Sequence, residues 1–104
     1  MERAEFISSL SEPNKVTVLF IDYPASAGRS WGKTVERMVN SIRGNLVVYK
    51  TVNADDEVAQ DALGLAEPPV VIIADNGEEI REFLGHGSAA DLAEIKSVIL
   101  PLID

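Results

Sequence analysis

The loop that follows the apolar run Val16–Asp22 is the first place to look for chemistry. A loop between a strand and a helix is where many α/β folds place their catalytic and binding groups. Here the loop Tyr23–Gly28 has no cysteine and no histidine, and the only acid beside it is Asp22. The sequence therefore has the position of a site but lacks the groups that usually make such a site reactive.

A second motif overlaps the end of this loop. Residues Ala27–Thr34 match a relaxed phosphate-binding loop with alanine in place of the first glycine, and the run Val70–Asp75 resembles a strand ending in a magnesium-binding acid. Such a loop must wrap its backbone amides around the phosphate. Trp31, Val35 and Met38, however, share one helical face, which predicts core packing and places the lysine of the motif inside the helix. Nucleotide or phosphate binding at Ala27–Thr34 therefore stands as an alternative function.

The other polar candidates favour ordinary structural roles. His86 is the only histidine, and we expect an exposed loop residue with no nucleophile beside it. Lys50 is expected to pair with Asp22 or another acid. One histidine and scattered carboxylates lack the ligand spacing of a zinc site, so neither a metal nor a cofactor is predicted. Ser26 and Arg29, at the start of a helix, leave open an anion site at its N-terminus.

Composition excludes several classes of partner. The chain has 104 residues, 46% of them hydrophobic, and a formal net charge of −8, which together predict one domain over residues 1–104. Nucleic acids and anionic membranes need clustered Lys and Arg, so neither is expected as a partner, whereas a basic protein remains open. No apolar stretch is long enough to span a membrane, and the first residues lack the features of a signal peptide. We expect a cytoplasmic location.

Hydrophobic spacing predicts alternating helices and strands. An antiparallel hairpin is expected at Asp75–Gly77, because an Asn-Gly pair there favours a two-residue turn. Ser88 and Asp91 resemble a capping box at the start of the last helix, and Pro101 favours an early end to that helix. Helices are expected at 2–11, 29–43, from Asp55 or Asp56 to about Leu63, and from Ser88 onward; strands are expected at 16–22, 45–52, 69–74 and 79–84.

The order of these elements predicts an α/β fold. The first two strands are joined through a helix and should form a right-handed parallel crossover. The last two strands are joined by only a few residues and must be antiparallel. The expected architecture has three layers, with a mixed central sheet of four or five strands flanked by helices.

With these loop residues, the chain resembles the thioredoxin-like family over nearly its whole length. Ala25–Gly28 falls where the family has Cys-Gly-Pro-Cys, and Lys50 falls on the family's strand lysine. Pro69 falls on the family's cis-proline, and Gly85 falls on the glycine that lines its substrate groove. The resemblance implies the family's three-layer fold and a cis peptide bond between Pro68 and Pro69.

The departures from the family pattern concern its chemistry. Thiol–disulfide exchange needs a thiolate and a second sulfur, and Ala25 and Gly28 supply neither. Leu19 replaces the family's buried proton-transferring carboxylate, and Ile21 stands where the family usually has tryptophan. We therefore predict a redox-inactive chain with no thiol–disulfide oxidoreductase activity, and not an enzyme.

The resemblance also implies a groove that needs no sulfur. In the family, the cis-proline loop presents a backbone edge that pairs with an extended peptide through main-chain hydrogen bonds. The predicted function is binding of another protein or extended peptide, in assembly or in a chaperone-like role, by a monomeric chain; a degenerate structural domain is a further alternative. The residues expected at this site are Ile21, Tyr23, Pro24, Ala25, Ser26, Glu67, Pro68, Pro69, Gly85 and His86.

Overall fold

The fold is built on one mixed sheet of four strands in the order β2-β1-β3-β4. A computed structural model describes residues 1–23, 29–42, 44–64 and 68–103. Strand β1 pairs parallel with β2 and antiparallel with β3, and β3 pairs antiparallel with β4. The predicted mixed α/β sheet is therefore confirmed, and the described residues form the four-stranded version. The elements are α1 (Arg3–Leu10), β1 (Val16–Asp22), α2 (Arg29–Ser41), β2 (Val47–Asn53), α3 (Glu57–Leu63), β3 (Val70–Asp75), β4 (Glu78–Leu84) and α4 (Ala89–Ile103).

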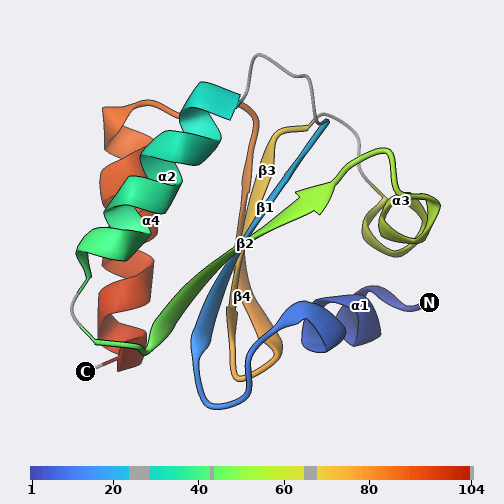
Figure 1. The fold of residues 1–104 in the computed structure, drawn as a ribbon, viewed down its shortest axis with the longest axis horizontal. Coiled ribbons are helices and arrows are strands. Elements are labelled where there is room, and N and C mark those ends of the chain that lie inside the picture. The colour runs from blue at the N-terminus through green and yellow to red at the C-terminus, as the bar shows by residue number, and fades with distance from the viewer. Residues whose placement is uncertain (24–28, 43, 65–67, 104) are drawn as a thin grey trace.

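Helices cover both faces of the sheet and make three layers. Helices α2 and α4 lie on one face, and α1 and α3 lie on the other (Figure 1). All seven residues of β1 are buried, because both faces of this central strand are covered. Its side chains alternate: Phe20 packs in the α2/α4 layer, whereas Leu19 and Ile21 pack in the α1/α3 layer. Asp22 follows Phe20 by two positions and therefore lies on the same side of β1 as Phe20.

Local signals in the sequence set the ends of several elements. Asp56 caps α3, with its carboxylate accepting a hydrogen bond from the Val58 backbone amide at 3.0 Å, and Gly64 ends the helix in the left-handed conformation. Asn76 and Gly77 both have positive φ, as a two-residue hairpin turn requires. These predictions are confirmed at the predicted residues.

The expectation for Pro101 is wrong. Helix α4 contains this proline and continues to Ile103. A proline in a helix removes one backbone donor, but near the C-terminus few hydrogen bonds remain to be lost. Leu102 and Ile103 pack against the core between α2, α4 and the sheet, and this packing stabilises the last turn. The described helices include none that is long and apolar enough to cross a membrane.

Candidate functional site

The ends of three strands meet at one edge of the molecule. Ile21 of β1 pairs with Val70 of β3, and Val70 in turn pairs with Leu84 of β4. Just beyond these pairs, the Gly85 amide donates a hydrogen bond of 2.8 Å to the Pro69 carbonyl oxygen. The structure thus brings together Pro69 and Gly85, two residues that lie 16 positions apart in the printed sequence.

The prolines determine which hydrogen bonds this edge can form. The peptide bond between Pro68 and Pro69 is cis. Neither proline has an amide hydrogen, so this segment can accept hydrogen bonds but cannot donate them. The Pro69 carbonyl already accepts from Gly85, whereas the Pro68 carbonyl takes no hydrogen bond from any residue in the described ranges. An extended partner could therefore pair with this segment by donating to the Pro68 carbonyl.

Exposed side chains surround these prolines. Tyr23 is 43% exposed at the end of β1, and His86 is exposed just beyond β4. Pro68 is half-buried and Pro69 is buried. We call Tyr23, Pro68, Pro69, Gly85 and His86 the prolyl edge.

Not every residue expected at the site is accessible. Ile21 is fully buried in the α1/α3 layer, so it supports the prolyl edge from below and offers no surface to a partner. Leu84 is 72% exposed beside Gly85 and was not among the expected residues. Its signal in the sequence was its position next to Phe83: consecutive strand residues point to opposite faces, and both are apolar. The expected residues Pro24, Ala25, Ser26 and Glu67 lie outside the described residues.

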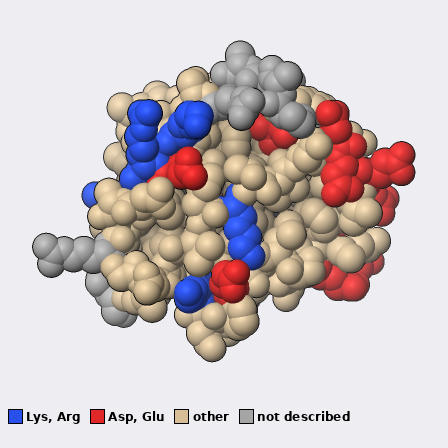
Figure 2. All heavy atoms as spheres, viewed as in Figure 1, with Lys and Arg blue, Asp and Glu red and all other residues tan. Residues whose placement is uncertain are grey.

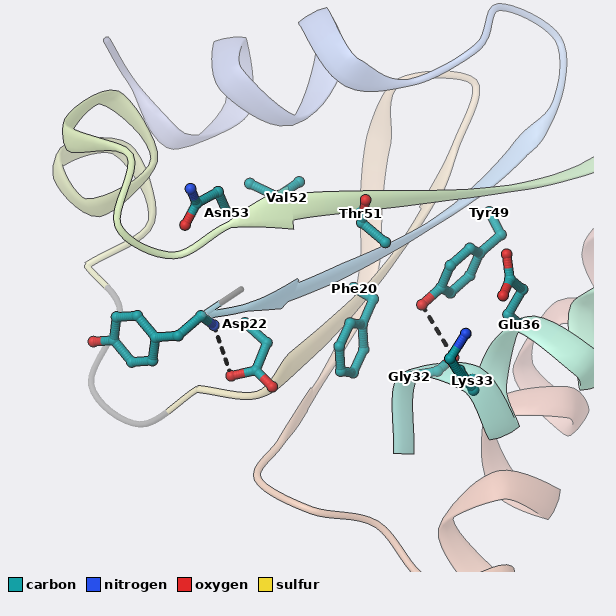
Figure 3. Close-up of a pocket in the computed structure, with 10 residues that line it drawn as sticks. Phe20, Asp22, Gly32, Lys33, Glu36, Tyr49, Thr51, Val52 and Asn53 are labelled. Atoms are coloured by element: carbon teal, nitrogen blue, oxygen red, sulfur yellow. Dashed lines mark hydrogen bonds between the residues drawn. The ribbon is translucent and has the colours of Figure 1, made fainter. Parts of the chain in front are cut away.

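A pocket of about 350 Å³ opens beside this edge, on the α2 side of β1 (Figure 3). Asp22 lines it and is only 6% exposed. One carboxylate oxygen, Oδ1, accepts a hydrogen bond of 2.8 Å from the Tyr23 backbone amide, and the other, Oδ2, has no hydrogen-bond partner among the residues that the structure describes. The lining residues are Phe20, Asp22, Tyr23, Gly32, Lys33, Glu36, Tyr49, Thr51, Val52 and Asn53.

Tyr49 closes the opposite side of this pocket. Its hydroxyl donates a hydrogen bond of 3.0 Å to the Gly32 carbonyl oxygen and so fixes the start of α2 against β2. Burial, together with the negative charge of Glu36, raises the pKa of the Tyr49 hydroxyl to about 12. Tyr49 therefore remains a neutral donor at physiological pH.

Lys50 points away from this pocket and does not pair with Asp22. Its ammonium nitrogen lies 3.0 Å from a Glu12 carboxylate oxygen and donates to the Leu10 carbonyl oxygen at 2.8 Å. The Lys50 ammonium group holds the pKa of Glu12 below its usual range, chiefly through its hydrogen bond to the Glu12 carboxylate. The expected pairing with another acid is confirmed, and it ties the segment after α1 to the sheet.

In the described residues, the motif does not have the geometry that a phosphate-binding loop needs. Lys33 and Thr34 lie inside α2, where the Thr34 hydroxyl donates to the Ser30 carbonyl oxygen at 3.0 Å. Trp31 is buried in the α2/α4 core, as expected. Backbone amides within the helix serve the helix itself and cannot wrap a phosphate. Across the described ranges, no group of His, Asp and Glu is placed to hold a metal ion.

Thiol–disulfide exchange is excluded by composition. The chain has no cysteine, so no thiolate can attack a disulfide. Leu19, at the position where the resemblance implies a proton-transferring acid, is fully buried among apolar side chains. This position therefore cannot move protons either.

Comparison with known proteins shows which solved structures share the architecture of the chain. No protein-family model matches the chain, and no curated protein is a significant match. Among solved structures, a mutant thioredoxin from Halobacterium salinarum NRC-1 superposes with a TM-score of 0.70 at 14% identity, covering 88% of this chain and 77% of its own. Thioredoxin from Malassezia sympodialis superposes with a TM-score of 0.69 at 20% identity, covering 96% of this chain and 85% of its own.

A third similar structure is thioredoxin from Fasciola hepatica. Its TM-score is 0.69 at 18% identity, over 86% of this chain and 82% of its own. At identities this low, the superpositions establish the architecture alone. The strand order of the chain agrees with that architecture. The chain therefore has a thioredoxin-like fold that lacks the cysteine pair.

Proposed function

We propose that this chain binds another protein at the prolyl edge and performs no redox or other catalysis. The partner presents an extended segment that pairs with the cis-proline loop, in assembly or in a chaperone-like role in the cytoplasm. The observation that supports this proposal is the Pro68 carbonyl, which accepts no hydrogen bond from the described residues and lies next to the bonded pair Pro69 and Gly85. A rigid backbone acceptor at a strand end is the feature that strand-like peptide pairing uses.

The chemistry of the edge restricts the partner. Because Pro68 and Pro69 cannot donate, the partner must supply the amide hydrogen for any hydrogen bond to Pro68. Tyr23 and Leu84, 43% and 72% exposed, offer apolar area on either side. The net charge of −8 favours a basic partner through long-range attraction.

The test is a titration of the isotope-labelled chain with a library of extended peptides, followed by backbone NMR. We expect saturable shifts that cluster at Tyr23, Gly85 and His86. A Leu84→Ser variant should weaken binding several-fold, because it removes exposed apolar area without disturbing the core. The matched control is Ile80→Ser, also apolar-to-hydroxyl, at an exposed position nearer the hairpin end of the same strand.

Other outcomes count against the proposal. Shifts located away from the prolyl edge would mean a different binding surface. Equal weakening by Leu84→Ser and Ile80→Ser would mean that general exposed apolar area is responsible. No shift with any peptide, and no partner captured by the intact chain in its native cell, would favour a degenerate structural domain.

The redox part of the proposal has its own test. In an insulin-reduction assay with a thiol reductant, the chain should give the same rate as buffer alone, because it has no sulfur nucleophile. A thioredoxin that has its cysteine pair serves as the positive control. Turnover above the buffer rate would refute the claim that the chain is redox-inactive.

A further inference from the structure

The pocket beside β1 is lined by a residue with a buried carboxylate oxygen that has no partner among the described residues. Asp22 is more than nine-tenths buried, yet its Oδ2 accepts no hydrogen bond from any of them. Figure 3 shows the Asp22 carboxylate on the same side of β1 as the Phe20 ring, facing the α2 side of the pocket. Buried polar groups are almost always hydrogen-bonded, so each exception requires an explanation.

Among the described residues, no other acid has a buried carboxylate oxygen without a hydrogen bond. Glu12 pairs with Lys50, and Glu79 and Glu82 both pair with Arg3. An apolar side chain at position 22 would avoid the desolvation of a half-satisfied carboxylate. Groups that weaken a fold in this way are characteristic of binding sites, where a ligand supplies the missing partner.

The remaining lining residues indicate the charge of that ligand. Glu36 is half-buried on α2 and makes no ion pair in the described part of the chain. The lining includes two acids, Asp22 and Glu36, and one basic residue, Lys33. Tyr49 and Phe20 add aromatic rings, whose faces attract cations. A donor with positive charge therefore fits this lining better than an anion or a neutral polar group.

We propose that this pocket binds a primary ammonium group, with Asp22 Oδ2 as its buried acceptor and the Phe20 and Tyr49 rings beside its alkyl chain. The volume of about 350 Å³ accommodates a short alkylammonium. The same chemistry is carried by a free amine and by a lysine side chain of another protein. This site is separate from the pairing proposed for Pro68, and either can fail without the other.

The test uses n-butylammonium and capped lysine (Nα-acetyl-lysine N-methylamide) as probes, titrated into the isotope-labelled full chain. We expect saturable NMR shifts at Phe20, Tyr49 and Asn53. Equal or tighter binding of capped lysine identifies a protein side chain as the source, whereas a clear preference for n-butylammonium identifies a free amine. The neutral isostere n-butanol should bind at least about tenfold more weakly, because it lacks the charge that pairs with Asp22.

Variants distinguish the effect of the Asp22 carboxylate from the effect of the net charge of the molecule. Asp22→Asn should weaken n-butylammonium binding about tenfold or more, since it removes a charge-assisted hydrogen bond. Asp75→Asn is the matched control: it changes the net charge equally, and Asp75 pairs with Val16 at the opposite end of β1 from Asp22. The control should bind n-butylammonium as the parent chain does. Glu36→Gln should weaken binding several-fold without altering a buried residue.

Three results would overturn the proposal. The absence of saturable shifts with either ammonium probe would remove the ligand class. Equal weakening by Asp22→Asn and Asp75→Asn would reduce the effect to the net charge of the molecule. A Tm of Asp22→Asn far below that of Asp75→Asn, measured without ligand, would show that the carboxylate serves the fold; the proposal expects it to be equal or higher.

Discussion

Among the glycines of the described residues, Gly87 has the least room for a side chain. A Cβ atom built there would lie 2.1 Å from Cζ2 of Trp31. The indole is 7% exposed and packs in the α2/α4 core, so it cannot move aside freely. We expect Gly87→Ala to lower the free energy of unfolding by about 1–3 kcal/mol, as overpacking of a core does. Urea denaturation followed by circular dichroism measures this loss.

A second background tests the cause of this loss. In a Trp31→Leu chain, the same Gly87→Ala change should be distinctly less destabilising, because the indole that it strikes is absent. Equal losses in both backgrounds would mean that the backbone at Gly87, and not its contact with Trp31, limits the substitution.

At this scale the sequence predicted some roles and missed others. The apolar spacing around Trp31 predicted its burial, and the glycines beside His86 predicted an exposed loop; both are confirmed. The state of Asp22 was not predictable, because a hydrogen-bond partner is chosen by the three-dimensional neighbourhood and not by neighbours in the chain. The burial of Ile21 followed from strand alternation, but the resemblance had placed this residue at the site.

Among the elements, α1 forms its polar contacts with β4 through the side chain of Arg3. The Arg3 guanidinium donates to both carboxylate oxygens of Glu79, at 2.8 and 2.9 Å, and to Glu82 at 2.9 Å. The guanidinium also donates a hydrogen bond of 3.1 Å to the Leu63 carbonyl oxygen at the end of α3. The hydrogen bonds to Glu79 and Glu82 raise the pKa of Arg3 further above its usual value. Arg3 thus joins α1, α3 and β4.

We expect Arg3→Lys to destabilise the chain by about 1 kcal/mol, although the charge is kept. Lysine cannot reproduce the two-pronged contact with a carboxylate, and the partly exposed pair is screened by solvent. Arg81→Lys is the control, because Arg81 pairs with Glu94 at a more exposed position. Chemical denaturation of both variants gives the comparison, and equal losses would contradict a special role for Arg3.

The start of α4 carries a capping box that depends on pH. Asp91 accepts hydrogen bonds from the Ser88 amide at 2.7 Å and from its hydroxyl at 2.9 Å. The Ser88 backbone bond lowers the pKa of Asp91 from its ordinary value. A carboxyl whose pKa is lower in the folded state stabilises the fold above its unfolded pKa, and this contribution is lost as the pH falls through the folded value.

The lowered pKa of Asp91 gives the direction of the expected result. Asp91→Asn should be less stable than the parent chain at neutral pH, and the difference should shrink as the pH falls below about 4. Thermal denaturation across this pH range measures it. A gap that is constant with pH would mean that the Asp91 charge does not contribute.

Most of the elements were predictable because their signals are local. The caps at Asp56 and Gly64 and the turn at Asn76 and Gly77 depend on a few neighbouring residues, and each lies where the sequence predicted it. Pro101 misled the prediction because its neighbours Leu102 and Ile103 pack against the core, and this packing comes from the tertiary structure. Propensity is a weak guide where packing opposes it.

At the scale of the whole molecule, charge is unevenly distributed. Figure 2 shows Asp and Glu side chains gathered over the α3 side of the visible face. Asp55, Asp56, Glu57 and Asp61 are all exposed there. Lys and Arg side chains lie mainly toward α2 and the centre of the same face (Figure 2). Such a gradient orients an approaching charged partner more than it stabilises the fold.

The sheet separates two hydrophobic layers, and their coupling decides whether the molecule unfolds as a unit. Ile72 packs in the α1/α3 layer, while its neighbour Ile73 packs with Trp31 in the α2/α4 layer. Trp31 is the only tryptophan, so its fluorescence reports on one layer alone. Far-UV circular dichroism reports on both layers together. Strands β1 and β3 contribute side chains to both layers. If one layer opens, it therefore exposes strands against which the other layer packs.

We therefore expect Ile72→Val to lower the free energy of unfolding by about 1 kcal/mol and to move both transitions equally. Ile73→Val, in the layer of Trp31 itself, is the matched control and should do the same. If Ile72→Val shifts the circular dichroism transition but leaves the Trp31 fluorescence midpoint in place, the layers unfold separately. The prolyl edge would then be joined to a less cooperative scaffold, because its strands belong to both layers.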